Sequence, residues 1–108
     1  MSRLSTHVLD TELGKPAAGV RVSLVRGETE IARGETGPDG RIADIGDGKL
    51  VDGSYGLVFD VAEYLARQGR QAPFLERVTI EFHVDQTQLQ YHVPLLVTSF
   101  ACTSYRGS

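Results

Sequence analysis

Two histidines and a short polar tail are the side chains in this 108-residue sequence best suited to acid–base chemistry. An imidazole changes charge near neutral pH, so His7 and His92 can each accept or release a proton under physiological conditions. The printed sequence closes soon after His92 with Tyr105-Arg106-Gly107-Ser108. This tail combines a phenol, a guanidinium, a hinge glycine and a hydroxyl beside a carboxylate. Tails are usually frayed and polar, but we expect this one to fold into a site.

The two histidines fall in segments that alternate polar and apolar residues, which is the pattern of a β-strand. In the segment 4–10, we place Leu4, Thr6 and Val8 toward the core, and this puts Ser5, His7 and Leu9 on the outer face. In the segment 89–98, the expected core face consists of Leu89, Tyr91, Val93, Leu95 and Val97. The opposite face then carries Gln90, His92, Pro94, Leu96 and Thr98.

The outer face shared by the histidines is unusually apolar, because Leu9, Pro94 and Leu96 lie on it. Apolar residues on a face that should meet water indicate that something covers it. We expect a second copy of the chain, since most soluble oligomers are symmetric homo-oligomers. A groove formed there would be apolar with a few polar groups, as small-molecule sites are. Pro94 cannot donate to a strand ladder, so it needs an edge, a bulge or a non-donating register.

The rest of the chain predicts an all-β, two-sheet sandwich in a single domain, 1–108. Alternation recurs at 20–24 and 55–59, and most clearly at 77–84, where the inward residues are Val78, Ile80, Phe82 and Val84. One short helix is expected at about 60–68. Asp60 and Glu63 have the spacing of a capping box, and Gly69 is a typical stop residue.

Composition excludes several classes of function. A net charge of −3 gives no reason to expect nucleic acid. There is no apolar run long enough to span a membrane, and no signal-peptide pattern, so we expect a cytoplasmic location. Cys102 is the single cysteine, which excludes an intrachain disulfide. Asp44, Asp47 and Asp52 lack calcium-loop spacing, and the three histidines lack a zinc signature, so no metal or cofactor is expected.

Taken one at a time, the remaining charged residues have ordinary interpretations. His83 lies on the polar face of an amphipathic strand, where we interpret it as solvated. Arg41 follows a Pro38-Asp39-Gly40 turn and is by default a hairpin charge in water, and Arg106 is by default a solvated tail charge. From the residues alone, the sequence therefore predicts a small oligomeric sandwich with a groove that holds two histidines, and it names no substrate.

Several of these segments resemble the transthyretin superfamily along the whole chain. The opening Leu4-Ser5-Thr6-His7-Val8-Leu9-Asp10 followed by Gly14-Lys15-Pro16-Ala17 is similar to the start of its members. Tyr91-His92-Val93-Pro94-Leu95-Leu96, with the tail Tyr105 to Ser108, resembles its enzymatic branch, the 5-hydroxyisourate hydrolases. The carriers of the superfamily lack the combination of this tail with two histidines. One stretch departs from the family pattern: Thr98-Ser99-Phe100-Ala101-Cys102 stands where a turn with proline, glycine and a second aromatic is usual.

The resemblance implies a homotetramer built as a dimer of dimers, with sites at the dimer–dimer interface. It implies catalytic roles for His7, Arg41, His92 and Ser108. It implies substrate binding by Tyr105, Arg106 and Gly107. The implied reaction is hydrolysis of 5-hydroxyisourate, a cyclic amide, to 2-oxo-4-hydroxy-4-carboxy-5-ureidoimidazoline in urate degradation.

This reaction needs a base for water, a stabilised oxyanion and a proton for the leaving nitrogen. His7 or His92 is the expected base, and we favour His92 because Ser108 is placed to orient it. Arg41 and Arg106 are expected to hold the substrate and the developing oxyanion. Ser108 as a nucleophile is an alternative that we rank lower, because a terminal residue is hard to hold precisely in place.

Two other classes of function compete with the hydrolase. A non-catalytic carrier for an aromatic small molecule needs a channel that does not react with its ligand, and two histidines plus the tail argue against it. A purely structural sandwich would use the apolar face for contacts alone. It predicts oligomerisation that is insensitive to His7 and His92.

Overall fold

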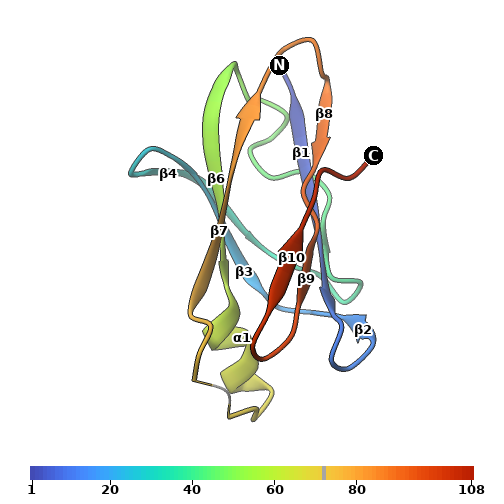
Figure 1. Ribbon diagram of the computed structural model, residues 1–108. Coiled ribbons are helices and arrows are strands. Elements are labelled where there is room, and N and C mark those ends of the chain that lie inside the picture. Colours follow the sequence, from blue (N-terminus) through green and yellow to red (C-terminus); the bar gives the residue numbers. More distant parts are fainter. Residues whose placement is uncertain (72) are drawn as a thin grey trace.

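Two β-sheets packed face to face form the molecule (Figure 1). The computed structural model describes residues 1–71 and 73–108. The first sheet follows the order β10-β9-β1-β2, and β5 and β8 also pair with β1. Its strands are β1 (Arg3–Asp10), β2 (Lys15–Pro16), β5 (Arg41–Ile42), β8 (Gln90–His92), β9 (Leu95–Val97) and β10 (Cys102–Ser104). The second sheet, in the order β4-β3-β6-β7, contains β3 (Arg21–Arg26), β4 (Thr29–Glu35), β6 (Gly53–Asp60) and β7 (Arg77–Val84). The two-sheet sandwich expected from the alternation is confirmed.

The core lies between the sheets because alternate side chains of both point inward. On β1, Leu4, Thr6, Val8 and Asp10 are all at most 1% exposed, as the alternation predicts for the first three. The second sheet contributes fully buried residues that include Leu24, Leu57 and Phe59. The intervening residues of β1 are half-buried, and they form the outer face of the first sheet.

Helix α1 (Val61–Arg67), the one helix among the described residues, closes one end of the sandwich, as Figure 1 shows. The expected cap is present: Asp60 Oδ1 accepts from the Glu63 backbone N–H at 3.2 Å. The return half of a capping box is replaced by an ion pair, because the Glu63 carboxylate lies 2.7 Å from Nε of Arg67. Gly69 follows with φ +70°, a conformation that suits glycine at a helix stop. None of the described helical residues forms a helix long and apolar enough to cross a membrane.

The strand at 77–84 has the predicted alternation but is less buried than its pattern suggests. Val84 is fully buried, whereas Val78, Ile80 and Phe82 are only partly buried, and the polar residues between them are exposed. The cause is its place in the sheet: β7 is an edge strand with one neighbour, β6.

The prediction of one continuous strand at 89–98 is wrong in two respects. It is broken into β8 and β9, which run parallel to β1 in one common register, so that Ser5 faces His92 and Val8 faces Leu95. Pro94 lies in the gap, where its missing N–H costs no ladder bond. Leu89 was expected in the core but is 72% exposed. Leu89 lies just before the first residue of β8, so the alternation of polar and apolar residues begins before the strand does.

Candidate active site

The pairing of β1 with β5 places His7 beside Arg41. These two residues are direct cross-strand partners, so their side chains share one face. A tight turn sets this register: Gly40 has φ +77° and donates to the Gly37 carbonyl at 2.9 Å. Asp39 Oδ1 then accepts from the backbone N–H of Arg41 at 3.0 Å. The turn that appeared to be ordinary hairpin chemistry is therefore what brings a guanidinium to the first histidine.

The pairing of β1 with β8 places His92 on this same face. His92 is the parallel partner of Ser5, which lies two residues before His7 and so points to the same side. The Ser5 hydroxyl lies 2.8 Å from Nδ1 of His92. His7, Arg41 and His92 are thus brought together by two ladders that share a single strand.

The tail reaches this group through Gly107. Its backbone N–H donates to the His92 carbonyl at 2.7 Å, in an isolated antiparallel bridge. A Cβ at position 107 would overlap Cδ2 of the imidazole ring. Only glycine lets the tail lie this close to His92. Ser108, the next residue, is exposed.

Burial, and after it the positive charges of Arg41 and His7, lowers the pKa of His92 below its ordinary value, while a hydrogen bond to the Ser5 backbone partly offsets this. The environment of His92 therefore favours the neutral imidazole, which has a lone pair with which to accept a proton. A neutral imidazole beside a guanidinium combines a base with a group that stabilises negative charge.

His7 is held differently from His92. Its Nε2 is enclosed and has no hydrogen-bond partner among the described residues. An enclosed polar atom without a partner costs about 1–3 kcal/mol, so this nitrogen gains a hydrogen bond only if the His7 ring turns or its surroundings open to admit a polar group. His92, by contrast, has Ser5 to orient it. This contrast favours His92 as the base and His7 as a binding group.

Tyr105 and Arg106 lie in a cavity with His83 rather than beside His7 and His92. The Arg106 guanidinium sits 5.3 Å from the centroid of the Tyr91 ring and donates to Gln88 Oε1 at 3.1 Å. Tyr91 faces the core, so Arg106 lies at the edge of the sandwich. Both tail residues line a cavity of about 440 Å³ between β7 and the tail. The structure therefore brings His7, Arg41, His92 and Gly107 together but leaves Tyr105 and Arg106 outside that group.

The outer face is partly covered by the chain itself. Pro94, expected on that face, is buried, and its carbonyl accepts from the Ser104 hydroxyl at 2.8 Å. Leu9 and Leu96 remain half-buried. The chain itself therefore buries only Pro94 of these three residues, and cover of the face by a second copy stays a prediction.

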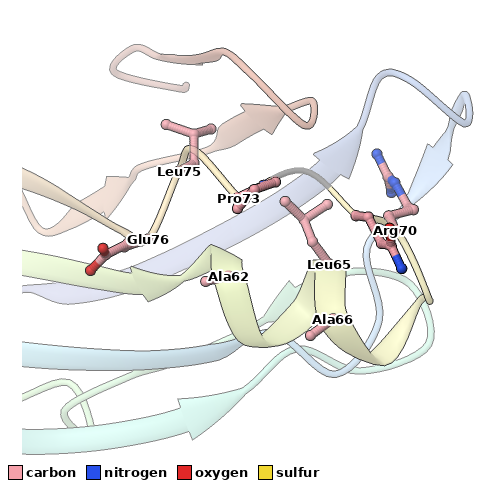
Figure 2. Close-up of a pocket in the computed structure, with 8 residues that line it drawn as sticks. Ala62, Leu65, Ala66, Arg70, Pro73, Leu75 and Glu76 are labelled. Atoms are coloured by element: carbon pink, nitrogen blue, oxygen red, sulfur yellow. The ribbon is translucent and has the colours of Figure 1, made fainter.

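A cavity of about 640 Å³ lies elsewhere, beside α1 (Figure 2). Ala62, Leu65 and Ala66 of α1 form one wall, and Pro73 and Leu75 of the following segment lie opposite them. No candidate site residue lines it. Over the residues that the structure describes, no group of three histidine, cysteine, aspartate or glutamate side chains is placed to hold a metal ion.

The sequence places Ser5 on the outer face but gives no sign that its hydroxyl contacts His92. The alternation had put it on the outer face with His7. Its role depends on the parallel register with β8, which joins residues 87 positions apart.

A two-sheet sandwich closed by one helix, with a histidine pair and an arginine on the outer face of one sheet, is a sandwich of the transthyretin type. The HIUase/Transthyretin family model matches residues 4–107, and the chain belongs to this family. The 5-hydroxyisourate hydrolase of Deinococcus radiodurans is 46% identical, and the match covers 97% of this chain and 95% of that protein.

Solved structures give the same result. The 5-hydroxyisourate hydrolase of Klebsiella pneumoniae superimposes with a TM-score of 0.93 at 39% identity, over 100% of both chains. Sea bream transthyretin in complex with thyroxine gives a TM-score of 0.86 at 28% identity, over 96% of this chain and 93% of that one. The fold is thus shared by a 5-hydroxyisourate hydrolase and by a transthyretin solved in complex with thyroxine.

Proposed function

We propose that this chain is a 5-hydroxyisourate hydrolase, which opens the six-membered ring to give 2-oxo-4-hydroxy-4-carboxy-5-ureidoimidazoline. The observation that carries the proposal is the placement of His92 beside His7 and Arg41 on one sheet face, where burial and the two neighbouring charges lower the pKa of His92. Relatives that match nearly the full length of the chain, including one from Halalkalibacterium halodurans at 42% identity, have the name of this enzyme.

In the proposed reaction, His92 removes a proton from water and the resulting hydroxide adds to the amide carbonyl of the ring. Arg41 stabilises the oxyanion. The C–N bond then breaks, the leaving nitrogen takes the proton from the His92 imidazolium, and the new carboxylic acid ionises. His7 binds a polar group of the substrate through Nε2.

We assign the tail a binding and orienting role. Because Gly107 lies against His92, it fixes the backbone position of the next residue, Ser108. In this proposal, the Ser108 hydroxyl orients the base or the attacking water. Tyr105 and Arg106 bind the anionic, carbonyl-rich substrate in this proposal. That role requires them to approach the histidine face from the sandwich edge, where Arg106 now contacts Tyr91.

The proposal includes a homotetramer, a dimer of dimers, with the histidine face turned toward a second copy. The half-buried Leu9 and Leu96 support such cover. A cytoplasmic location remains a prediction.

The direct test is a spectroscopic assay. 5-Hydroxyisourate is generated in situ from urate with urate oxidase, the protein is added, and the ultraviolet decay is compared with the spontaneous background. We expect a clear acceleration that scales with protein concentration. No acceleration by the folded protein would refute the hydrolase.

A carrier is the second candidate, because the thyroxine complex of sea bream transthyretin shares the fold. A carrier predicts saturable binding of an aromatic ligand such as thyroxine, measured by fluorescence, together with no acceleration in the assay. The neutral His92 argues against it, since a carrier has no use for a base.

Replacing Gly107 with alanine is expected to lower the rate by about tenfold or more while the fold is retained. The added methyl group overlaps the His92 ring, and overpacking of this kind costs about 1–3 kcal/mol, so the tail moves away from the base. Cys102→Ala, at an exposed position on β10, is the control. Equal rates for the two variants would show that contact of the tail with His92 is dispensable.

A further inference from the structure

We propose that Ser5 is the positioning residue of the active site: its hydroxyl accepts a hydrogen bond from Nδ1–H of His92 and leaves Nε2 as the nitrogen that takes the proton. This inference rests on the proposed function, because it names how the base of that reaction is prepared. It assigns to Ser5 no contact with the substrate.

The position of the Ser5 hydroxyl is set by the backbone. Ser5 lies inside β1, directly opposite His92 in a parallel ladder, and its carbonyl accepts from the Val93 N–H at 3.0 Å. A serine side chain has one rotatable bond to its oxygen, so little freedom is left once the strand is fixed. The distance of 2.8 Å from Oγ to Nδ1 is that of a well-formed hydrogen bond.

A hydroxyl can donate or accept, so the direction of this bond needs a second observation. The Ser5 backbone also interacts with the His92 ring, and this interaction favours the protonated form. A backbone carbonyl can only accept, which favours a hydrogen on the ring nitrogen that faces Ser5, and the proposal places it there. In a neutral imidazole, the other nitrogen then has the free lone pair.

Gly107 fixes the opposite edge of the ring. Its Cα is so close to Cδ2 of His92 that no side chain fits between them. Turning the ring over would exchange Nδ1 with Cδ2 and place a carbon against the Ser5 hydroxyl, which would lose the hydrogen bond. Ser5 and Gly107 therefore select both the tautomer and the orientation of the base, as a carboxylate does for the histidine of a serine protease.

The test uses three variants of the full-length chain. Ser5→Ala removes the hydroxyl, and Ser5→Thr keeps it. Ser54→Ala is the matched control, because Ser54 is the exposed cross-strand partner of His83 on the other sheet. The measurements are kcat and KM with 5-hydroxyisourate, and the ring-nitrogen NMR spectrum of labelled histidine, with the His92 signals identified by their loss in His92→Ala.

We expect the neutral His92 of the wild-type chain to carry its hydrogen on Nδ1. Ser5→Ala shifts the population of His92 toward the Nε2–H tautomer, which has no lone pair on the nitrogen that takes the proton. It therefore lowers kcat by about tenfold or more, while KM is nearly unchanged because Ser5 does not contact the substrate. Ser5→Thr restores both, and Ser54→Ala changes neither.

The proposal is overturned if wild-type His92 carries its hydrogen on Nε2, or if Ser5→Ala leaves both tautomer and kcat unchanged. A fall in kcat without a tautomer shift also overturns it, since this means that the serine acts in another way. Failure of the proposed function gives a different result: the wild-type chain does not accelerate the decay, while the spectrum still decides whether Ser5 sets the His92 tautomer.

Discussion

Replacing His92 with alanine is expected to lower kcat/KM for 5-hydroxyisourate by about a hundredfold or more, because a positioned general base contributes about 10²–10⁴-fold to a rate. Arg41 and the tail remain in this variant, so some acceleration over the background should persist, as it does when other enzymes lose their base. The measurement is the initial rate of ultraviolet decay over a range of substrate concentrations.

His83→Ala provides the comparison with another histidine, because His83 is exposed on β7, in the cavity that Tyr105 and Arg106 line rather than beside His7 and Arg41. It should retain the wild-type rate. A His92→Ala rate within a few fold of wild type would remove His92 from the role of base. If the rate then fell in His7→Ala instead, the two histidines would have to exchange roles.

The pH profile gives a second check on the same assignment. Burial, followed by the charges of Arg41 and His7, lowers the pKa of His92 below the ordinary histidine value of 6.5. A base works only when neutral, so kcat/KM should stay high as the pH falls to 6.5 and decline only below it. Arg41→Gln removes a positive charge, so the acidic limb should move to higher pH.

Much of the site follows from local signals in the sequence. The alternation in β1 places His7 and Ser5 on one face because that strand is regular and its inner face is fully buried. Asp60, Glu63 and Gly69 mark α1 to within a residue at each end, since helix caps are local hydrogen bonds and turns. These features need no knowledge of distant contacts.

The sequence predictions fail where contacts between residues far apart in the chain determine the structure. Leu89 continues the alternation of its neighbours, but the ladder with β1 begins one residue later, and alternation cannot say where a ladder starts. The tail is similar: the bridge from Gly107 to His92 and the placement of Arg106 on Tyr91 are tertiary contacts with no periodic signature. The motif identifies Tyr105 and Arg106 as candidates, but it does not say which side of the sandwich they occupy.

Asp10 is the clearest case of a residue that sequence reasoning could not interpret. It closes β1, and its side chain is 0% exposed. The Tyr64 hydroxyl donates to it at 2.7 Å and the Leu13 N–H at 3.1 Å. Arg70, which is 17% exposed, completes the group with an ion pair across 60 positions of sequence. This cluster ties the end of the strand that carries both Ser5 and His7 to the helix.

Two pKa shifts describe the cluster. Burial alone would raise the pKa of Asp10, but hydrogen bonds from Arg70, Tyr64 and Leu13 outweigh it, so the pKa falls below its ordinary value. Burial, together with the neighbouring Asp10 carboxylate, raises the pKa of Tyr64 to about 12, so the phenol remains a donor at every physiological pH.

Asp10→Asn is therefore expected to lower the free energy of unfolding by about 2 kcal/mol at pH 7, because it removes one of the two carboxylates that pair with the largely buried Arg70 guanidinium and leaves only Glu12. That is a large share of the total for a domain whose stability is about 5–15 kcal/mol. Urea unfolding at one fixed protein concentration measures it. Glu30→Gln, which breaks the exposed Glu30–Arg33 pair, should cost under about 1 kcal/mol.

The pH dependence of this difference has a definite sign. A carboxyl whose pKa is lowered by folding stabilises the protein above its unfolded pKa of about 3.9 and loses that contribution as the pH falls through the lower folded value. The gap between wild type and Asp10→Asn should thus be full at pH 7 and shrink below about pH 4. A gap that is no larger than that of Glu30→Gln, or that widens in acid, would mean that the ion pair does not hold the helix to β1.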